Sequence, residues 1–290
     1  MLQVVADRLY ATSPSSILYH YTSLQGLLGI VRTKKLWASD IHYLNDAQEL
    51  KNFSNYIAIQ VLKRKEQNEI GVHILEQFRD WLVDRTSYGP MMFVGSFTEN
   101  GNLLSQWRGY CPYGKGVSIG FEATLLSAEA SRASFAIGRC LYDIQDHERL
   151  AVQVVDHIAA TSKHYEVPKD AVEHQSHYAL FLSLEPLLLR IAALVKHPSF
   201  KEEAEWRLVS PVLNNYVEPP IAYREGPSSL VPYLEIPLPI NSNGALRIRR
   251  TIVGPSPNPN LSIEAVSRFL SKEKVAPNEV WSSAIPYRQA

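Results

Sequence analysis

The chain has 290 residues, of which 46% are hydrophobic and 20% charged, and its 29 basic and 29 acidic residues give zero net charge. This length and ordinary composition allow a sizeable hydrophobic core and exclude a disordered or fibrous protein. A chain without net charge offers no broad field for nucleic acid or membrane surfaces, so a general nucleic-acid-binding protein is not expected.

The cysteine and hydropathy patterns favour a protein of the cytoplasm. Cys111 and Cys140 are too few for a disulfide framework, and isolated thiols are typical of a reducing compartment. The first residues lack the apolar core of a signal peptide. The longest apolar stretch, at 179–196, is interrupted by Glu185 and Arg190, so we expect no membrane span and no membrane partner.

The first half of the chain mixes strands and helices. Apolar residues recur at helical spacing from Leu24 to Lys34, and Thr22 or Ser23 is suited to cap this helix at its N-terminus. The other expected elements follow from alternation, β-propensity or helical spacing: strands at 17–21, 36–39, 91–97, 116–121 and 136–142, and helices at 47–67 and 69–85.

The second half begins with a helical block at 145–196, broken near Pro168. It continues with strands at 204–212, 233–238, 248–253 and 280–285 and a helix at 263–270. Strands therefore come from both ends of the sequence. We predict one α+β domain over residues 1–290, with mixed or antiparallel sheets and the block at 145–196 inserted as a cap or lid.

Polar residues crowd together between two apolar strands, from Gly95 to Tyr110. Placing so many polar groups at strand ends is costly unless something is bound there. Ser96 is a candidate for binding a ribose or phosphate, and Arg108 for holding an anion through two hydrogen bonds. The alternative is a buried pair of Arg108 with a carboxylate, with Trp107 in the core.

A second candidate cluster lies where the first strand meets the first helix. His20, Tyr21 and Thr22 stand at this junction, and an imidazole followed by hydroxyls at a helix N-terminus can bind a ligand hydroxyl or phosphate. The alternative is a core histidine bonded to a neighbouring carbonyl, with Thr22 only capping the helix.

Tyr43 and the Asn45-Asp46 pair form a third cluster. The ring of Tyr43 could stack on a planar ligand, and the Asn-Asp pair could orient a loop. The alternative for Asn45 and Asp46 is turn chemistry, with Asp46 capping the next helix.

The fourth cluster runs from Glu202 to Val209 and is centred on Glu205-Trp206-Arg207. Side chains alternate along a strand, so Glu205 and Arg207 share one face while Trp206 and Leu208 share the other. A carboxylate beside a guanidinium stays ionised. The alternative is a surface ion pair on a half-exposed strand.

No metal site is expected. The nine histidines are scattered, and His174 and His177 lack an acidic or thiol partner at ligand spacing. No phosphate-binding glycine loop and no nucleophile elbow is present either.

Several motifs in a fixed order resemble a bacterial family of unknown function, the domain-of-unknown-function family numbered twenty-nine seventy-one. The resemblance spans nearly the whole chain and rests on the combination, because each piece alone is weak. The motifs are Leu18-Tyr19-His20-Tyr21-Thr22, Leu44-Asn45-Asp46 with Glu49, Ser96-Phe97-Thr98-Glu99, Trp107-Arg108-Gly109-Tyr110, Gly116 to Phe121, Glu205-Trp206-Arg207 and Ile285-Pro286-Tyr287-Arg288. The family name carries no activity.

The opening of the chain also resembles ADP-ribosyltransferases of the His-Tyr-Glu type. The resemblance implies that NAD is the substrate, that His20 holds the nicotinamide ribose, that Tyr43 stacks on nicotinamide and that Glu205 polarises the ribose hydroxyl. Arg108 and Arg207 would hold the pyrophosphate. No Ser-Thr-Ser strand and no long active-site loop is assigned, which departs from the pattern of those enzymes.

Such a reaction requires no metal. A fixed carboxylate such as Glu205 would stabilise the oxocarbenium ion that forms when the glycosidic bond of NAD breaks. The resemblance implies a macromolecular acceptor, protein or nucleic acid, and a role as a toxin or phage-defence effector, with an antitoxin partner as an open question. Two competing functions are a non-catalytic sensor of nucleotides or phosphorylated ligands and a metal-independent nuclease or hydrolase that uses His20.

Overall fold

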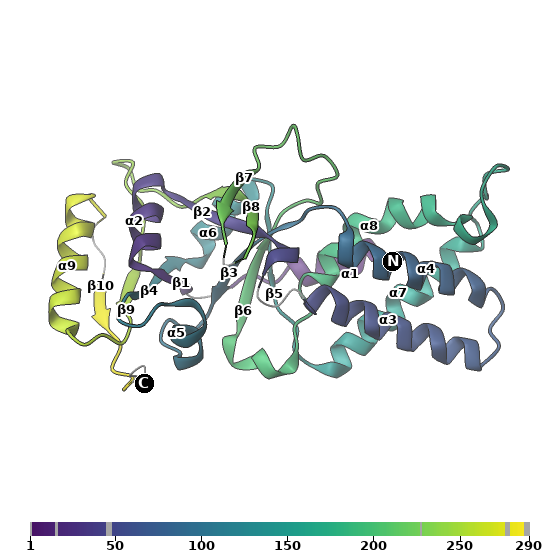
Figure 1. The fold of residues 1–290 in the computed structure, drawn as a ribbon, viewed down its shortest axis with the longest axis horizontal. Coiled ribbons are helices and arrows are strands. Elements are labelled where there is room, and N and C mark those ends of the chain that lie inside the picture. The colour runs from purple at the N-terminus through teal and green to yellow at the C-terminus, as the bar shows by residue number, and fades with distance from the viewer. Residues whose placement is uncertain (1, 15–16, 45–47, 227, 276–278, 287–290) are drawn as a thin grey trace.

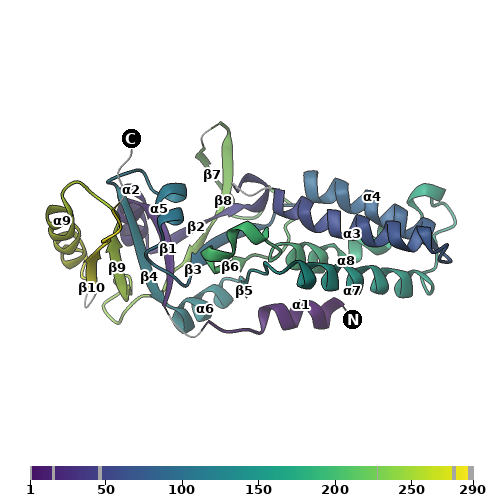
Figure 2. The ribbon, with the colours of Figure 1, turned by 90° about the horizontal axis from the view of Figure 1, so that it is seen from below.

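The computed structural model describes residues 2–14, 17–44, 48–226, 228–275 and 279–286. The molecule is elongated, with a β-sheet and its covering helices at one end and a bundle of helices at the other (Figure 1). Figure 2 shows helix α1 running along the bundle and helix α9 at the opposite end of the molecule. The sequence motifs at Asn45, Asp46, Tyr287 and Arg288 lie outside the described residues.

One mixed sheet contains all the strands of the described part of the chain. Its main path is β10-β9-β4-β1-β3-β2-β8-β7, and β6 pairs with both β3 and β5. Strands β9 and β10 are parallel, and the other pairs are antiparallel. The strands are β1 (Ile17–Ser23), β2 (Lys35–Asp40), β3 (Phe93–Thr98), β4 (Gly116–Glu122), β5 (Ala136–Arg139), β6 (Glu205–Val209), β7 (Ala222–Glu225), β8 (Leu230–Pro237), β9 (Arg250–Val253) and β10 (Glu279–Ser282).

The helices divide between the two ends of the molecule, and the α+β prediction is confirmed. The bundle contains α1 (Leu2–Tyr10), α3 (Gln48–Glu66), α4 (Val72–Tyr88), α7 (Ile144–Ser162) and α8 (Tyr178–Ala192). The sheet end contains α2 (Leu24–Thr33), α5 (Leu104–Tyr110), α6 (Ala123–Arg132) and α9 (Pro259–Lys272). Short 3-10 helices lie at Ile41–Tyr43, Glu173–Gln175 and Pro198–Glu203. Within the described ranges, no helix is both long and apolar enough to cross a membrane.

The segment 145–196 is helical as predicted, but its helices do not stand apart as a cap. α7 and α8 pack with α1, α3 and α4, which precede them in the chain (Figure 1). Phe53, Phe78, Val154 and Phe181 meet in the buried core of this bundle. Amphipathic helices bury their apolar faces against one another, so the bundle needs contributions from both parts of the sequence.

A second core lies between the sheet and the helices that cover it. Leu18 of β1, Val31 of α2, Ile119 of β4 and Trp206 and Leu208 of β6 are all buried there. Trp206 and Leu208 thus face this core, which confirms the alternation predicted for the strand.

Among the α-helices and strands of the described residues, α1, α5, α6 and β7 were not anticipated from the sequence. The segment 104–110 was expected to be a polar connection beside a turn. It forms α5 instead, with Gln106 and Trp107 buried on its inner face and Arg108 exposed. A helix this short presents too few residues for its periodicity to be recognised, and the helix is stabilised mainly by packing.

Strands β1 and β3 separate soon after they meet. β1 pairs with β4 along seven residues, from Ile17↔Glu122 to Ser23↔Gly116, but with β3 only through Tyr19↔Thr98. The rest of β3 pairs with β6 on one side and β2 on the other. A gap therefore opens between β1 and β3, and residues of both strands line the pocket that lies there.

Candidate functional site

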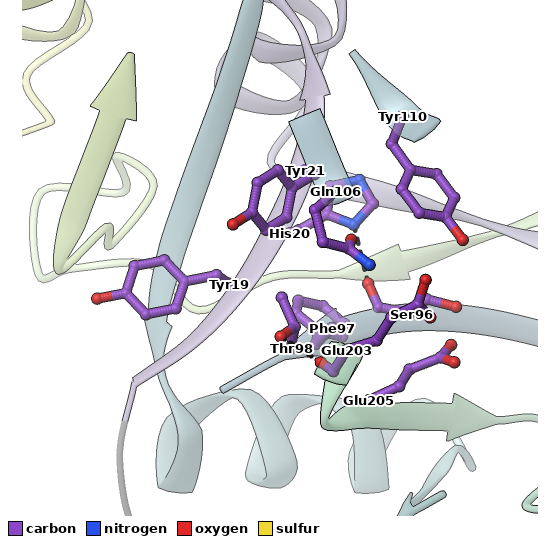
Figure 3. Close-up of a pocket in the computed structure, with 10 residues that line it drawn as sticks. All are labelled: Tyr19, His20, Tyr21, Ser96, Phe97, Thr98, Gln106, Tyr110, Glu203 and Glu205. Atoms are coloured by element: carbon purple, nitrogen blue, oxygen red, sulfur yellow. Dashed lines mark hydrogen bonds between the residues drawn. The ribbon is translucent and has the colours of Figure 1, made fainter. Parts of the chain in front are cut away.

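A pocket of about 50 Å³ opens at this gap between β1 and β3. Residues from four parts of the chain line it: Tyr19, His20, Tyr21, Ser96, Phe97, Thr98, Gln106, Tyr110, Glu203 and Glu205. Figure 3 shows His20 and Gln106 close together and Ser96, Glu203 and Glu205 grouped beside them, whereas Tyr19 points away. Polar groups from strands far apart in sequence therefore converge on one small space.

His20 bridges the gap between the strands. Its Nδ1 lies 3.0 Å from the carbonyl oxygen of Ser96. A carbonyl can only accept, so Nδ1 carries the proton and Nε2 is left as an acceptor at the pocket. Burial lowers the pKa of His20, and the bond to Ser96 offsets this only in part. The imidazole is therefore neutral at pH 7.

Helix α5 forms the wall of the pocket that carries Gln106 and Tyr110. The Tyr21 hydroxyl holds the start of this helix, because it donates to the Asn100 carbonyl at 2.9 Å and accepts from the Leu103 amide at 2.8 Å. Packing of Tyr21 edge-on against Trp107 adds to the attachment. One hydroxyl on β1 thus fixes the position of the helix beside the pocket.

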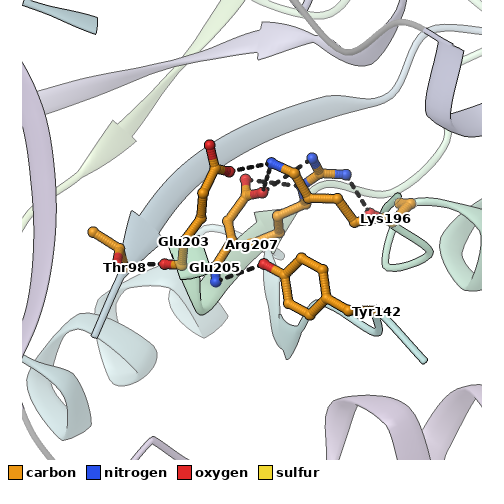
Figure 4. A network of polar contacts seen from close by, with 7 residues as sticks. Thr98, Tyr142, Lys196, Glu203, Glu205 and Arg207 are labelled. Carbon is orange, nitrogen blue, oxygen red and sulfur yellow. Dashed lines mark hydrogen bonds and ion pairs between the residues drawn. The ribbon is translucent and has the colours of Figure 1, made fainter. Parts of the chain in front are cut away.

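The carboxylates of the pocket belong to a buried network that, within the described residues, includes Lys196, Glu203, Glu205 and Arg207 (Figure 4). Lys196 Nζ lies 2.6 Å from both Glu203 Oε2 and Glu205 Oε2. Arg207 donates to the two Glu205 oxygens from Nε at 3.0 Å and from Nη2 at 3.2 Å, and its Nη1 donates to the Ala193 carbonyl at 2.7 Å. Among the described residues, each of the two carboxylates thus has a cation beside it, as buried charges require.

Local backbone geometry brings the two glutamates together. Ala204 adopts the left-handed region with φ 43°, which ends the 3-10 helix and starts β6. The Thr98 hydroxyl donates to the Glu203 carbonyl at 2.5 Å, and the Glu205 amide donates to the Tyr142 hydroxyl at 2.9 Å. These bonds hold the backbone on both sides of Ala204, so the two carboxylates reach the same ammonium group.

The cations keep Glu205 ionised. Burial alone would raise the pKa of Glu205, but Arg207 and Lys196 outweigh it and lower that pKa to about 2. The carboxylate is consequently charged at any pH at which the protein is expected to work. A carboxylate of this kind can stabilise a positive charge that develops on a ligand in the pocket. Lys196 and Arg207 limit how closely that charge can approach Glu205.

The structure brings together only some of the residues singled out in the sequence. His20, Tyr21, Ser96 and Glu205 line the pocket. Arg207 lies behind it, buried and paired with Glu205, so the alternative of a surface ion pair on a half-exposed strand is wrong.

The other three candidates do not line the pocket. Tyr43 lies in the 3-10 helix after β2 and is 47% exposed, and Arg108 is exposed on α5. Thr22 is not the helix cap, because Ser23 Oγ accepts from the Gly26 amide. The Thr22 carbonyl instead lies 3.4 Å from the Cys111 thiol.

Gln106, Tyr110, Lys196 and Glu203 also belong to the site, but no role was predicted for them, although Glu203 lies within the fourth cluster. Gln106 and Tyr110 are four apart, the spacing of one helix face, but α5 was not recognised. Lys196 follows the buried run Ile191 to Val195, and a lysine next to such a run was a signal for a buried, paired cation. Within the described ranges, no group of three or more potential metal-ligating side chains gathers.

A family model described as "Protein of unknown function (DUF2971)" matches residues 106–208. This is the family recognised from the motifs, and the recognition is confirmed over that segment, roughly a third of the chain. The segment contains Gln106 and Tyr110 of α5 and the charged residues Lys196, Glu203, Glu205 and Arg207. No curated protein and no solved structure matches the chain. The resemblance to ADP-ribosyltransferases stays a prediction.

Proposed function

We propose that the pocket is the active site of an NAD-dependent ADP-ribosyltransferase that modifies an intracellular macromolecule. One observation supports this proposal above the others. His20 of β1 and Glu205 of β6, two of the residues to which the resemblance assigns roles, line the same pocket although they lie far apart in the sequence. Ser96 lies between them and accepts the hydrogen bond from His20.

The reaction breaks one bond and forms another. The bond between the ribose carbon and the nicotinamide nitrogen breaks, and its electron pair neutralises the positive nitrogen of the leaving nicotinamide. A nucleophilic oxygen or nitrogen of the acceptor then bonds to the ribose carbon and releases a proton. Glu205 stabilises the positive charge on the ribose between these events, and Glu203, the second carboxylate in the pocket wall, accepts the proton.

His20 and Tyr110 take positioning roles in this scheme. The Nε2 lone pair of His20 accepts a hydrogen bond from a ribose hydroxyl, because Nδ1 is committed to Ser96. Tyr110 supplies an aromatic ring at the pocket, a role for which Tyr43 is poorly placed. Sites that enclose a ligand typically measure about 300–1,000 Å³. A pocket of 50 Å³ must therefore widen before the ribose and nicotinamide enter.

The biological role we propose is that of a toxin or phage-defence effector in the cytoplasm, with a protein or nucleic acid as acceptor and an antitoxin as a regulating partner. The presence of only two, isolated cysteines is the observation that favours an intracellular setting.

Incubation with labelled NAD and a cell lysate tests the proposal. We expect label transfer or nicotinamide release by the wild type and a loss of at least a hundredfold in Glu205→Gln, because the substitution removes the charge that stabilises the transition state. Glu185→Gln is the matched control, since Glu185 is a buried, arginine-paired glutamate inside the bundle. Absence of turnover by the folded wild type, under conditions in which a known transferase works, would refute the proposal.

A sensor of nucleotides or phosphorylated ligands is the second candidate. It is favoured by one observation: Lys196 and Arg207 already bond both oxygens of Glu205. Calorimetry with NAD on wild type and Glu205→Gln separates the two functions. Binding that survives the substitution, without turnover in either protein, would establish the sensor.

A further inference from the structure

A larger cavity, of about 310 Å³, lies where the helical bundle meets the sheet. Phe135 and Ala136, at the start of β5, form one wall, and Pro186 of α8 and Val212, beyond β6, form others. These residues give the cavity an apolar lining. It lies apart from the pocket between β1 and β3, because the two have no lining residue in common.

A positively charged side chain, Arg190 in the last turn of α8, also lines this cavity. The carbon at the centre of its guanidinium group lies 4.6 Å from the centroid of the Tyr10 ring, and its carbonyl accepts from the Tyr10 hydroxyl at 2.8 Å. The Tyr10 ring thus covers one face of the Arg190 guanidinium group. Within the described residues, no carboxylate pairs with Arg190. A guanidinium remains charged in proteins, so a partly buried one favours an anion beside it.

Two serines add hydrogen-bonding groups to the same cavity. Ser131 and Ser134 lie at the end of α6 and in the turn that follows, and both line the cavity. A helix C-terminus carries partial negative charge, so this neighbourhood disfavours a dianion such as phosphate. A carboxylate carries a single charge and fits the planar fork of an arginine.

We propose that this cavity binds a small organic carboxylate with an apolar body and that its occupancy affects the pocket between β1 and β3. The carboxylate pairs with Arg190 and accepts from the serine hydroxyls, and its apolar part fills the space beside Phe135 and Pro186. The two sites are linked through β6, because Val209 lines the cavity and Glu205 lines the pocket on the same strand. The binding claim is independent of the function proposed for that pocket.

Calorimetry with benzoate and hexanoate as probes tests the binding. We expect saturable binding by the wild type and a loss of at least tenfold in Arg190→Gln, with benzamide, the uncharged analogue of benzoate, binding at least tenfold more weakly. Arg132→Gln is the matched control, because Arg132 lies close by on α6 but is 71% exposed and paired with Glu129. Its affinity should equal that of the wild type.

A second variant keeps the charge and removes the space. Ala136→Leu fills the cavity and should abolish benzoate binding while Arg190 remains in place. Circular dichroism verifies that each variant is folded, and Arg190→Lys, which keeps the charge without the planar fork, should recover part of the affinity. Unchanged binding in both Arg190→Gln and Ala136→Leu, or no saturable binding of either probe, would overturn the proposal.

Benzoate should also shift the NMR amide signals of β6, because Val209 lines the cavity. The absence of any shift in β6 would overturn the link between the two sites.

Discussion

Two buried glutamates, each paired with an arginine, show how differently the two ends of the molecule use the same chemistry. Glu185 of α8 pairs with Arg85 of α4, and this pair joins two helices of the bundle. Glu205 of β6 pairs with Arg207 and shares Lys196 with Glu203. Among the described residues, the pair of Glu185 and Arg85 has no further ion-pair partner. The pair of Glu205 and Arg207 belongs to a larger network, and Glu203 and Glu205 of this network line a pocket.

The exposure of the arginines differs as well. The Arg85 side chain is 26% exposed, so water solvates part of the charge, while that of Arg207 is only 1% exposed. Burying charges fully is expensive, and a buried ion pair often stabilises a protein no more than apolar residues of the same volume. A pair at a helix interface is explained by joining the helices. A fully buried charged network in a pocket wall is instead what the proposed ligand binding or catalysis would explain.

The largest expected effect comes from Arg207→Met. The substitution leaves the Glu205 carboxylate buried with Lys196 as its remaining cation, so the free energy of unfolding should fall by about 3–5 kcal/mol. Urea denaturation measures this change in the free energy of unfolding. The matched variant Arg85→Met should lose clearly less, because water reaches the space beside Glu185. Equal losses of unfolding free energy in Arg207→Met and Arg85→Met would show that the two ion pairs are buried at the same cost and would contradict this comparison.

Acid should weaken the sheet end through Glu205. Its pKa of about 2 in the folded protein lies below the ordinary value of 4.5. The corresponding stability is fully present above pH 4.5 and is lost as the pH falls toward 2, with a total of about 3 kcal/mol. Urea denaturation between pH 6 and pH 2.5 should show a smaller decrease for Glu205→Gln than for the wild type. Parallel curves for the two proteins would contradict the low pKa.

A smaller effect is expected for the attachment of α5. Tyr21→Phe removes a hydroxyl that makes two hydrogen bonds, so the free energy of unfolding should fall by about 1–2 kcal/mol. Amide exchange at Leu103 should accelerate, because its amide loses its acceptor. Tyr19→Phe is the control, since the Tyr19 hydroxyl makes one longer contact, 3.3 Å to Arg250. Slow exchange at Leu103 in Tyr21→Phe would show that other contacts hold α5.

The smallest effect is expected at Tyr43. This side chain is 47% exposed and does not line the pocket, so Tyr43→Ala should change the free energy of unfolding by less than about 0.5 kcal/mol. NAD binding and any turnover should match the wild type. A tenfold loss of either would place Tyr43 at the site after all and would restore the role that the resemblance implies for it.

Sequence patterns predicted the long and regular parts of the fold. The helix expected at 24–34 is α2, and those expected at 47–67 and 69–85 are α3 and α4. The strand expected at 204–212 is β6, shorter at its C-terminal end. The apolar periodicity of α2 is strong and independent of the rest of the molecule, and α3 and α4 are long enough to be recognised although their periodicity is weaker. α5 and β7 were not predicted, because elements of seven and four residues are stabilised by their neighbours.

The sequence by itself determined that Glu205 and Arg207 project from one face of a strand, because alternation is a local property of an extended backbone. It also determined that His20 stands where β1 is followed by a helix. Only the tertiary structure decided that His20 and Glu205 share a pocket and that Lys196 lies between two carboxylates. Those contacts depend on where β1 separates from β3 and on how β6 is paired, and both are set by packing between segments far apart in the chain.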